Sequence, residues 1–222
     1  MKTEEVRAKI KEIGIVAAIR VASRADALFA AEAVFQGGIP VVEIALTLDG
    51  ATDVISQLVK ENPQMVVGAG SVLNEKVAQA CLDAGAHFIT SDRLHVHLVA
   101  VAKKHGIIVF PGALTPTEVI SAWEAGCDFV KVAPCAEIGG DVYIRSLRKM
   151  FPNIPLIAAG GINQQSASRY IAAGAVALGI GSELIPPDAI KRRQADRIRE
   201  LTHRFSNFVK SAHDGTTAEL RW

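Results

Sequence analysis

Two charged residues interrupt apolar runs of the sequence, and their types suit chemistry at a carbonyl carbon. Lys131 lies within "DFVKVAP" and Glu43 within "IPVVEIALT". Burial disfavours the charged form of an amine, and a neutral lysine amine can attack a carbonyl to give a Schiff base, with a nearby carboxylate carrying protons. The pair therefore predicts carbonyl chemistry through an imine. The alternative is a structural ion pair, which stabilises a fold poorly because desolvation of both charges offsets their attraction.

Eight apolar runs, separated by Ala-rich amphipathic stretches, predict the elements that would position these side chains. A glycine follows several of the amphipathic stretches, as at a helix C-terminus, and the next run does not alternate with polar residues, as in a parallel strand covered on both faces. Eight such units in 222 residues favour one α/β domain over residues 1–222, a (β/α)8 TIM barrel with a C-terminal helix and a short tail. A doubly wound sheet of fewer strands stays open, because periodicity does not show closure. The predicted strands are Ile15–Arg20, Val41–Thr47, Val66–Gly70, Phe88–Ser91, Ile107–Phe110, Phe129–Ala133, Leu156–Gly160 and Ala177–Gly181.

Alternation along two of these strands predicts where the charged side chains point. Successive residues of a barrel strand face inward and outward in turn, and the immediate neighbours of Lys131 and Glu43 are all apolar. If the more apolar set packs under the helices, both charges point into the barrel. Lys131 also lies near the C-terminal end of its strand, where TIM barrels carry their active sites.

Glycine clusters after the last two predicted strands suit an anion. Gly160 and Gly161 lie in "AAGGIN", and Gly181 and Ser182 lie in "GIGSEL". Glycine lets backbone N–H groups approach an anion closely, and the loops after strands seven and eight form the usual phosphate site of TIM barrels. Ser182 adds a hydroxyl donor. A third cluster, "VGAGSVLN", offers Ser71 and its neighbouring amides to a carboxylate.

Composition narrows the class of partner. The net charge of +1 gives no electrostatic case for a nucleic acid or a membrane surface. Three cysteines suit a reducing compartment, and the charged N-terminal stretch "MKTEEVRAKIKEIG" does not resemble a signal peptide. No run of about 18 apolar residues is present to span a bilayer. We therefore expect a cytoplasmic protein that acts on a small molecule.

Histidine and cysteine spacing does not predict a metal site. His95 and His97 in "LHVHL" come nearest, but an i, i+2 spacing on a helix points the two rings in different directions. The cysteines have no metal-type spacing. We expect chemistry without a metal.

Five motifs occur in the order and spacing of a known family: "VVEIALT", "VGAGSVLN", "FVKVAPCAEIGG", "AAGGI" and "GIGSELIP". From about Gly14 to Pro187 the chain resembles the 2-keto-3-deoxy-6-phosphogluconate (KDPG) aldolase family, which includes the 4-hydroxy-2-oxoglutarate and phosphogalactonate aldolases. The resemblance implies a class I aldolase that forms an imine with pyruvate, needs no metal or cofactor, and assembles as a homotrimer.

The resemblance also implies roles for individual residues. Lys131 matches the Schiff-base lysine and Glu43 the acid/base. Ser71 stands where the family commonly has a threonine that contacts the pyruvate carboxylate, and Gly160, Gly161, Gly181 and Ser182 match the phosphate cradle. Arg20, at the end of the first strand, is a carboxylate partner or else a solvated strand end.

The chain departs from the family around the substrate. Thr47, a candidate substrate contact, replaces an arginine or another polar residue. Ala133 replaces a phenylalanine, which should enlarge the pocket, and Ala159 replaces a threonine or valine. Asp92 replaces a proline and precedes Arg93, and these two either contact the substrate or pair with each other.

The sequence leaves three candidate functions. The first is cleavage of a 2-keto-3-deoxy-6-phospho sugar acid to pyruvate and glyceraldehyde 3-phosphate. The second is an aldolase for 4-hydroxy-2-oxoglutarate, the galactonate epimer or a non-phosphorylated keto-deoxy acid. The third is a phosphosugar-binding barrel without catalysis.

Overall fold

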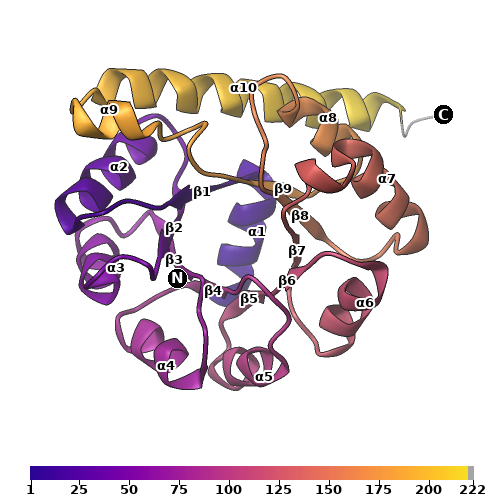
Figure 1. Ribbon diagram of the computed structural model, residues 1–222, viewed down its shortest axis with the longest axis horizontal. Coiled ribbons are helices and arrows are strands. Elements are labelled where there is room, and N and C mark those ends of the chain that lie inside the picture. Colours follow the sequence, from indigo (N-terminus) through magenta and orange to yellow (C-terminus); the bar gives the residue numbers. More distant parts are fainter. Residues whose placement is uncertain (220–222) are drawn as a thin grey trace.

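The strands form one parallel sheet that closes on itself, as Figure 1 shows. The computed structural model describes the backbone of residues 1–219 and the side chains of residues 1–215. The sheet order is β5-β4-β3-β2-β1-β9-β8-β7-β6. The strands are β1 (Ile15–Ile19), β2 (Val41–Ala45), β3 (Val66–Gly70), β4 (Phe88–Thr90), β5 (Ile108–Phe110), β6 (Gly112–Ala113), β7 (Val130–Val132), β8 (Leu156–Ala159) and β9 (Ala177–Ile180).

Pro111 divides one strand of the barrel into two short strands, and the sheet closes at this point. β5 pairs with β4 and β6 pairs with β7, and only Pro111 separates β5 from β6. Proline has no N–H to donate to a ladder, so the pairing is interrupted there, although the Pro111 carbonyl still accepts a bond of 2.9 Å from the Lys131 N–H. The two short strands are therefore halves of one barrel strand. This arrangement confirms the predicted (β/α)8 barrel. The strand predicted at Ile107–Phe110 continues to Ala113, three residues further than predicted, and every other predicted strand end lies within two residues of the observed one.

Helices cover the outside of the barrel. Some begin at side-chain caps: Asn74 accepts a bond from the Val77 N–H, and Thr115 forms a capping box with Glu118. Their bounds are α1 (Thr3–Ile13), α2 (Arg24–Gln36), α3 (Ala51–Glu61), α4 (Glu75–Asp83), α5 (Val96–His105), α6 (Pro116–Glu124), α7 (Gly140–Met150), α8 (Ala167–Ala172), α9 (Pro187–Lys191) and α10 (Ala195–Glu219), with a short 3-10 helix at Ala136–Ile138.

The C-terminal helix α10 lies across α2 and α8 along one side of the barrel (Figure 1). It corresponds to the predicted amphipathic helix, and the tail predicted after it lies beyond the residues that the structure describes. Over residues 1–219, none of the helices has the length and apolar character needed to cross a membrane.

Two apolar clusters lie on opposite sides of the sheet, and they fix the direction of the charged side chains. The inner cluster fills one end of the barrel with Phe88, Phe110 and Phe129, and α1 closes that end with Val6 and Ile10. The outer cluster packs the strands against the helices and includes Val42, Ile44, Val130 and Val132. Glu43 and Lys131 alternate with these outer residues, so both point into the barrel, as predicted.

Candidate active site

A cavity of about 520 Å³ opens at the C-terminal ends of the strands. Small inward residues leave this space, since Ala18, Ala133, Ala159 and Gly179 stand where larger side chains would fill the barrel. Seven of the nine candidate site residues line it: Arg20, Glu43, Lys131, Gly160, Gly161, Gly181 and Ser182.

Lys131 and Glu43 are connected through the hydroxyl of Thr90. The Lys131 Nζ donates to Thr90 Oγ1 at 3.4 Å, and Thr90 Oγ1 donates to Glu43 Oε2 at 3.0 Å. All three residues are buried. Gly70 makes room for the carboxylate, because a Cβ at that position would lie 2.2 Å from Glu43 Oε1. The site thus holds a buried amine and a buried carboxylate one hydroxyl apart, which suits proton transfer.

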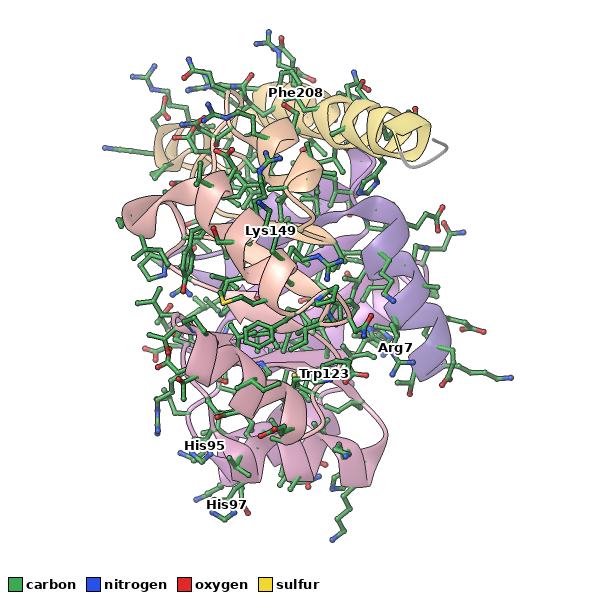
Figure 2. All side chains as sticks on the ribbon, turned by 90° about the vertical axis from the view of Figure 1, so that its right-hand side faces the viewer. Arg7, His95, His97, Trp123, Lys149 and Phe208 are labelled. Carbon is green, nitrogen blue, oxygen red and sulfur yellow. The ribbon has the colours of Figure 1, made fainter. Side chains whose placement is uncertain are left out.

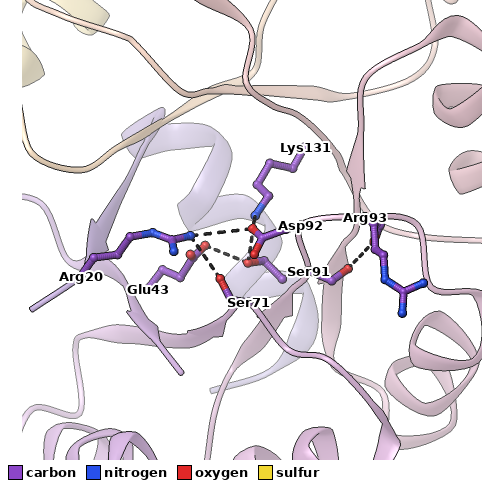
Figure 3. A network of polar contacts seen from close by, with 8 residues as sticks. Arg20, Glu43, Ser71, Ser91, Asp92, Arg93 and Lys131 are labelled. Atoms are coloured by element: carbon purple, nitrogen blue, oxygen red, sulfur yellow. Dashed lines mark hydrogen bonds and ion pairs between the residues drawn. The ribbon is translucent and has the colours of Figure 1, made fainter. Parts of the chain in front are cut away.

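A second carboxylate, Asp92, lies on the other side of the amine (Figure 3). Its Oδ1 is 3.2 Å from Lys131 Nζ and 3.7 Å from Arg20 Nη2, and Arg20 Nη2 donates to Ser71 Oγ at 3.1 Å. Figure 3 shows Arg93 pointing away from this group, so the alternative in which Asp92 and Arg93 pair with each other is wrong.

The surroundings of Asp92 favour its ionised form. Partial burial by itself raises the pKa of Asp92, but a hydrogen bond from Ser71 and the charges of Lys131 and Arg20 together outweigh that effect. The pKa therefore lies below its ordinary value, and the side chain is a carboxylate at neutral pH. Ser71 itself adopts a left-handed backbone conformation with φ of 58°, which is uncommon outside glycine and places its hydroxyl between Arg20 and Asp92.

The turn after β8 requires glycine. Gly160 and Gly161 have φ of 86° and 72°, and a Cβ on Gly161 would lie 2.4 Å from the Cβ of Ala136. Over residues 1–219, the backbone N–H groups of Gly161 and Ser182 donate to no backbone or side-chain acceptor. Both residues line the cavity, so these donors can bind an anion there.

Thr47 and Ser71 complete the set of candidate residues, and neither lines the cavity. Ser71 belongs to the site through its bond with Arg20. Thr47 lies beyond the end of β2 and is exposed, so its contact with a substrate stays a prediction. Thr90 is not among the residues that the sequence predicts for the site, and Asp92 is predicted there as a departure from the family that either contacts the substrate or pairs with Arg93. Strand alternation could have indicated both, because positions 88, 90 and 92 follow one another on the inner side.

Histidines lie outside this site. Figure 2 shows His95 and His97 at the outer edge of the molecule near α5, and their ring centroids are 6.3 Å apart. Among the described residues, no three His, Cys, Asp or Glu side chains gather in a way that could hold a metal ion.

Comparison with known proteins shows the family of the chain. Residues 6–201 match the model of the KDPG and KHG aldolases. The chain belongs to this family. Its members are aldolases, so the protein is a lyase, and the resemblance seen in the five motifs is confirmed.

Relatives with named activities cover most of the chain. The 2-dehydro-3-deoxy-phosphogluconate aldolase of Pseudoalteromonas atlantica is 33% identical over 77% of this chain and 80% of its own length. The 2-dehydro-3-deoxy-6-phosphogalactonate aldolase of Escherichia coli is 30% identical over 90% of this chain and 95% of its own. Among solved structures of the family, the KDPG aldolase of Legionella pneumophila, captured with pyruvate as a covalent carbinolamine, has a TM-score of 0.83 at 28% identity and covers 89% of this chain and 96% of its own.

Proposed function

We propose that the protein is a class I aldolase that cleaves a 2-keto-3-deoxy-6-phospho sugar acid to pyruvate and glyceraldehyde 3-phosphate. The observation that carries this proposal is the buried connection of Lys131 to Glu43 through Thr90. A reactive amine needs a proton carrier within reach of the same carbon skeleton, and the two face one cavity.

Imine formation is the first step. The neutral amine of Lys131 attacks C2 of the keto acid, and the carbinolamine loses water to give an iminium ion. Glu43 supplies the proton that turns the departing hydroxyl into water. Arg20 and Ser71 hold the C1 carboxylate, since a guanidinium and a hydroxyl lie together beside the amine.

Bond cleavage follows with the iminium as the electron sink. The Glu43 carboxylate takes the proton of the C4 hydroxyl, the C3–C4 bond breaks, and its electron pair forms an enamine while the aldehyde leaves. Glu43 returns the proton to C3 of the enamine. Hydrolysis of the resulting iminium releases pyruvate and restores the neutral amine, and Glu43 takes the proton that the attacking water loses, which returns Glu43 to its starting form.

The glycine turns after β8 and β9 are the proposed binding site for the phosphate end of the substrate. The free N–H groups of Gly161 and Ser182, with the Ser182 hydroxyl, suit a phosphate bound in the same cavity as Lys131. We also infer, as the family resemblance implies, a cytoplasmic homotrimer, for which light scattering should give about three times the chain mass of 23.6 kDa.

A non-phosphorylated keto-deoxy acid or 4-hydroxy-2-oxoglutarate is the second candidate substrate, and one side chain favours it. Glu183 follows Ser182 and lines the same cavity, so it adds negative charge near the proposed phosphate position. Turnover of substrates with and without the phosphate separates the two candidates. Ser182→Ala should raise KM for the phosphorylated substrate only.

Borohydride reduction in the presence of pyruvate tests the mechanism. We expect the peptide that contains Lys131 to gain the mass of a reduced pyruvate adduct, and Lys131→Ala to lose both this label and aldol cleavage. Labelling of any other lysine in place of Lys131 would contradict the proposal. Pyruvate release from epimeric keto-deoxy acids then identifies the substrate, and no release from any of them would favour a barrel that only binds phosphosugars.

A further inference from the structure

Asp92 places a carboxylate among the side chains that would bind the carboxylate of the substrate in the proposed reaction. It follows β4 in the connection that leads to α5, and its side chain is 56% exposed. Its carboxylate contacts Lys131 and Arg20, and the neighbouring Ser71 hydroxyl, which accepts from Arg20, helps to lower its pKa. One carboxylate thus engages a guanidinium, a hydroxyl and an ammonium at once.

The same three groups are those that a 2-keto acid needs. In such an acid the carboxylate carbon is bonded directly to the carbonyl carbon. A carboxylate held by Arg20 and Ser71 therefore places the carbonyl carbon next to the Lys131 amine. The carboxylate of Asp92 lies in that position, and two carboxylates sharing these partners would repel each other.

We propose that Asp92 is a displaceable internal carboxylate: in the free enzyme it pairs with Arg20, Ser71 and Lys131, and the carboxylate of an incoming 2-keto acid replaces it there. The inference rests on the proposed aldolase function and goes beyond it, because it assigns a role to a side chain that the reaction itself does not require. The loop position and exposure of Asp92 allow the displacement. Asp92 therefore lowers the affinity for the keto acid, because the substrate must displace it.

The charges around Lys131 decide the direction of the pH effect. Glu43 faces it from β2 through Thr90, Arg20 faces it from the end of β1, and Glu183 lines the same cavity after β9. Asp92 is the carboxylate in direct contact with the amine. Its removal leaves the positive charge of Arg20 nearby and takes away an attraction that favours the ammonium form. The amine should then become reactive at a lower pH.

Trace labelling with a small amine-reactive reagent tests the resting pair. The label on the Lys131 peptide is measured by mass spectrometry between pH 6 and 11 in the wild type, Asp92→Asn and Asp92→Ala. We expect the midpoint of labelling to move to lower pH in both variants. Asp83→Asn, which removes an exposed carboxylate at the end of α4, serves as the matched control and should keep the wild-type midpoint. Unchanged midpoints in both Asp92 variants would overturn the proposal.

Pyruvate affinity tests the displacement. From the concentration dependence of borohydride trapping, we expect pyruvate to bind Asp92→Asn about twofold to fivefold more tightly than the wild type, as loss of a competing, partly exposed ion pair implies. Weaker binding, or slower cleavage with unchanged binding, would overturn the proposal, because Asp92 would then bind the substrate or carry protons. A wild-type protein that forms no imine would contradict the aldolase function, whereas the labelling experiment needs no imine and decides the Asp92 pairing alone.

Discussion

Glu43 and Lys131 share one hydroxyl, that of Thr90, which lies 3.0 Å from the carboxylate and 3.4 Å from the amine. Within the described residues the two charges form no direct ion pair. A hydroxyl can donate to one group while it accepts from another, so Thr90 connects the proposed proton carrier to the proposed nucleophile. This relationship makes Thr90 a positioning residue for the proposed reaction.

Replacement of Thr90 tests that role. Thr90→Val keeps the shape but removes the hydroxyl, so the Glu43 carboxylate loses its orientation toward the amine. We expect kcat for aldol cleavage to fall by about 10- to 100-fold with a smaller change in KM, a range set by typical acid–base contributions. Thr90→Ser keeps the hydroxyl and should recover most of the rate in steady-state kinetics. Equal kcat values for the valine variant and the wild type would contradict the role.

The glycines that follow β8 and β9 should differ in their tolerance of substitution. Gly161→Ala combines a left-handed backbone with a Cβ 2.4 Å from Ala136, so we expect the free energy of unfolding to fall by about 1–3 kcal/mol. At Gly181 a Cβ would meet only the Ala18 carbonyl oxygen at 3.6 Å, so Gly181→Ala should change stability by less than about 1 kcal/mol. Urea denaturation of both variants measures the difference. Equal losses of unfolding free energy in the two variants would contradict the prediction, because the turn after β8 would then have relaxed around the added Cβ.

Ala133 should control the size of acceptable substrates. It lines the cavity near Lys131, and Ala133→Phe would fill part of the space with a ring. We expect kcat/KM for a six-carbon keto acid to fall by about tenfold or more, since overpacking of a formed site costs on the order of 1–3 kcal/mol. Borohydride trapping of the smaller pyruvate should change less. A variant that cleaves the six-carbon acid as well as the wild type would contradict the proposed enlargement.

Stability should depend on pH through His87. The Val67 N–H donates to its Nδ1 at 3.1 Å, and burial lowers the pKa of His87 below its ordinary value. The unfolded chain therefore binds this proton more readily. The contribution of His87 to the free energy of unfolding is complete above about pH 6.5 and is lost as the pH falls below that value.

A titrating and a non-titrating side chain can be compared directly. In His87→Asn the amide oxygen can still accept the Val67 N–H, so we expect a smaller loss of unfolding free energy between pH 7 and pH 5 in chemical denaturation. Some slope should remain, because burial also lowers the pKa of His213. The exposed His203→Asn is the control. A wild-type slope in His87→Asn would contradict the prediction.

The local sequence pattern was sufficient to predict the helices and strands and the direction in which the Lys131 and Glu43 side chains point. The apolar neighbours of Lys131 and Glu43, with a side-chain period of two, placed both inside the barrel, and the paired glycines located the turn after β8. These features depend on residues close together in the chain, so one sequence determines them.

Contacts between distant residues were decided only by the tertiary structure. Thr90 and Asp92 lie 41 and 39 positions from Lys131, and they meet it because closure at Pro111 sets the order and the register of the strands. Side-chain alternation says which face a residue occupies, but it does not say which residues of other strands share its height in the barrel. For that physical reason the sequence by itself pointed to Lys131 and Glu43 as the proposed nucleophile and proton carrier, while the hydroxyl between them and the carboxylate beside them emerged only from the fold.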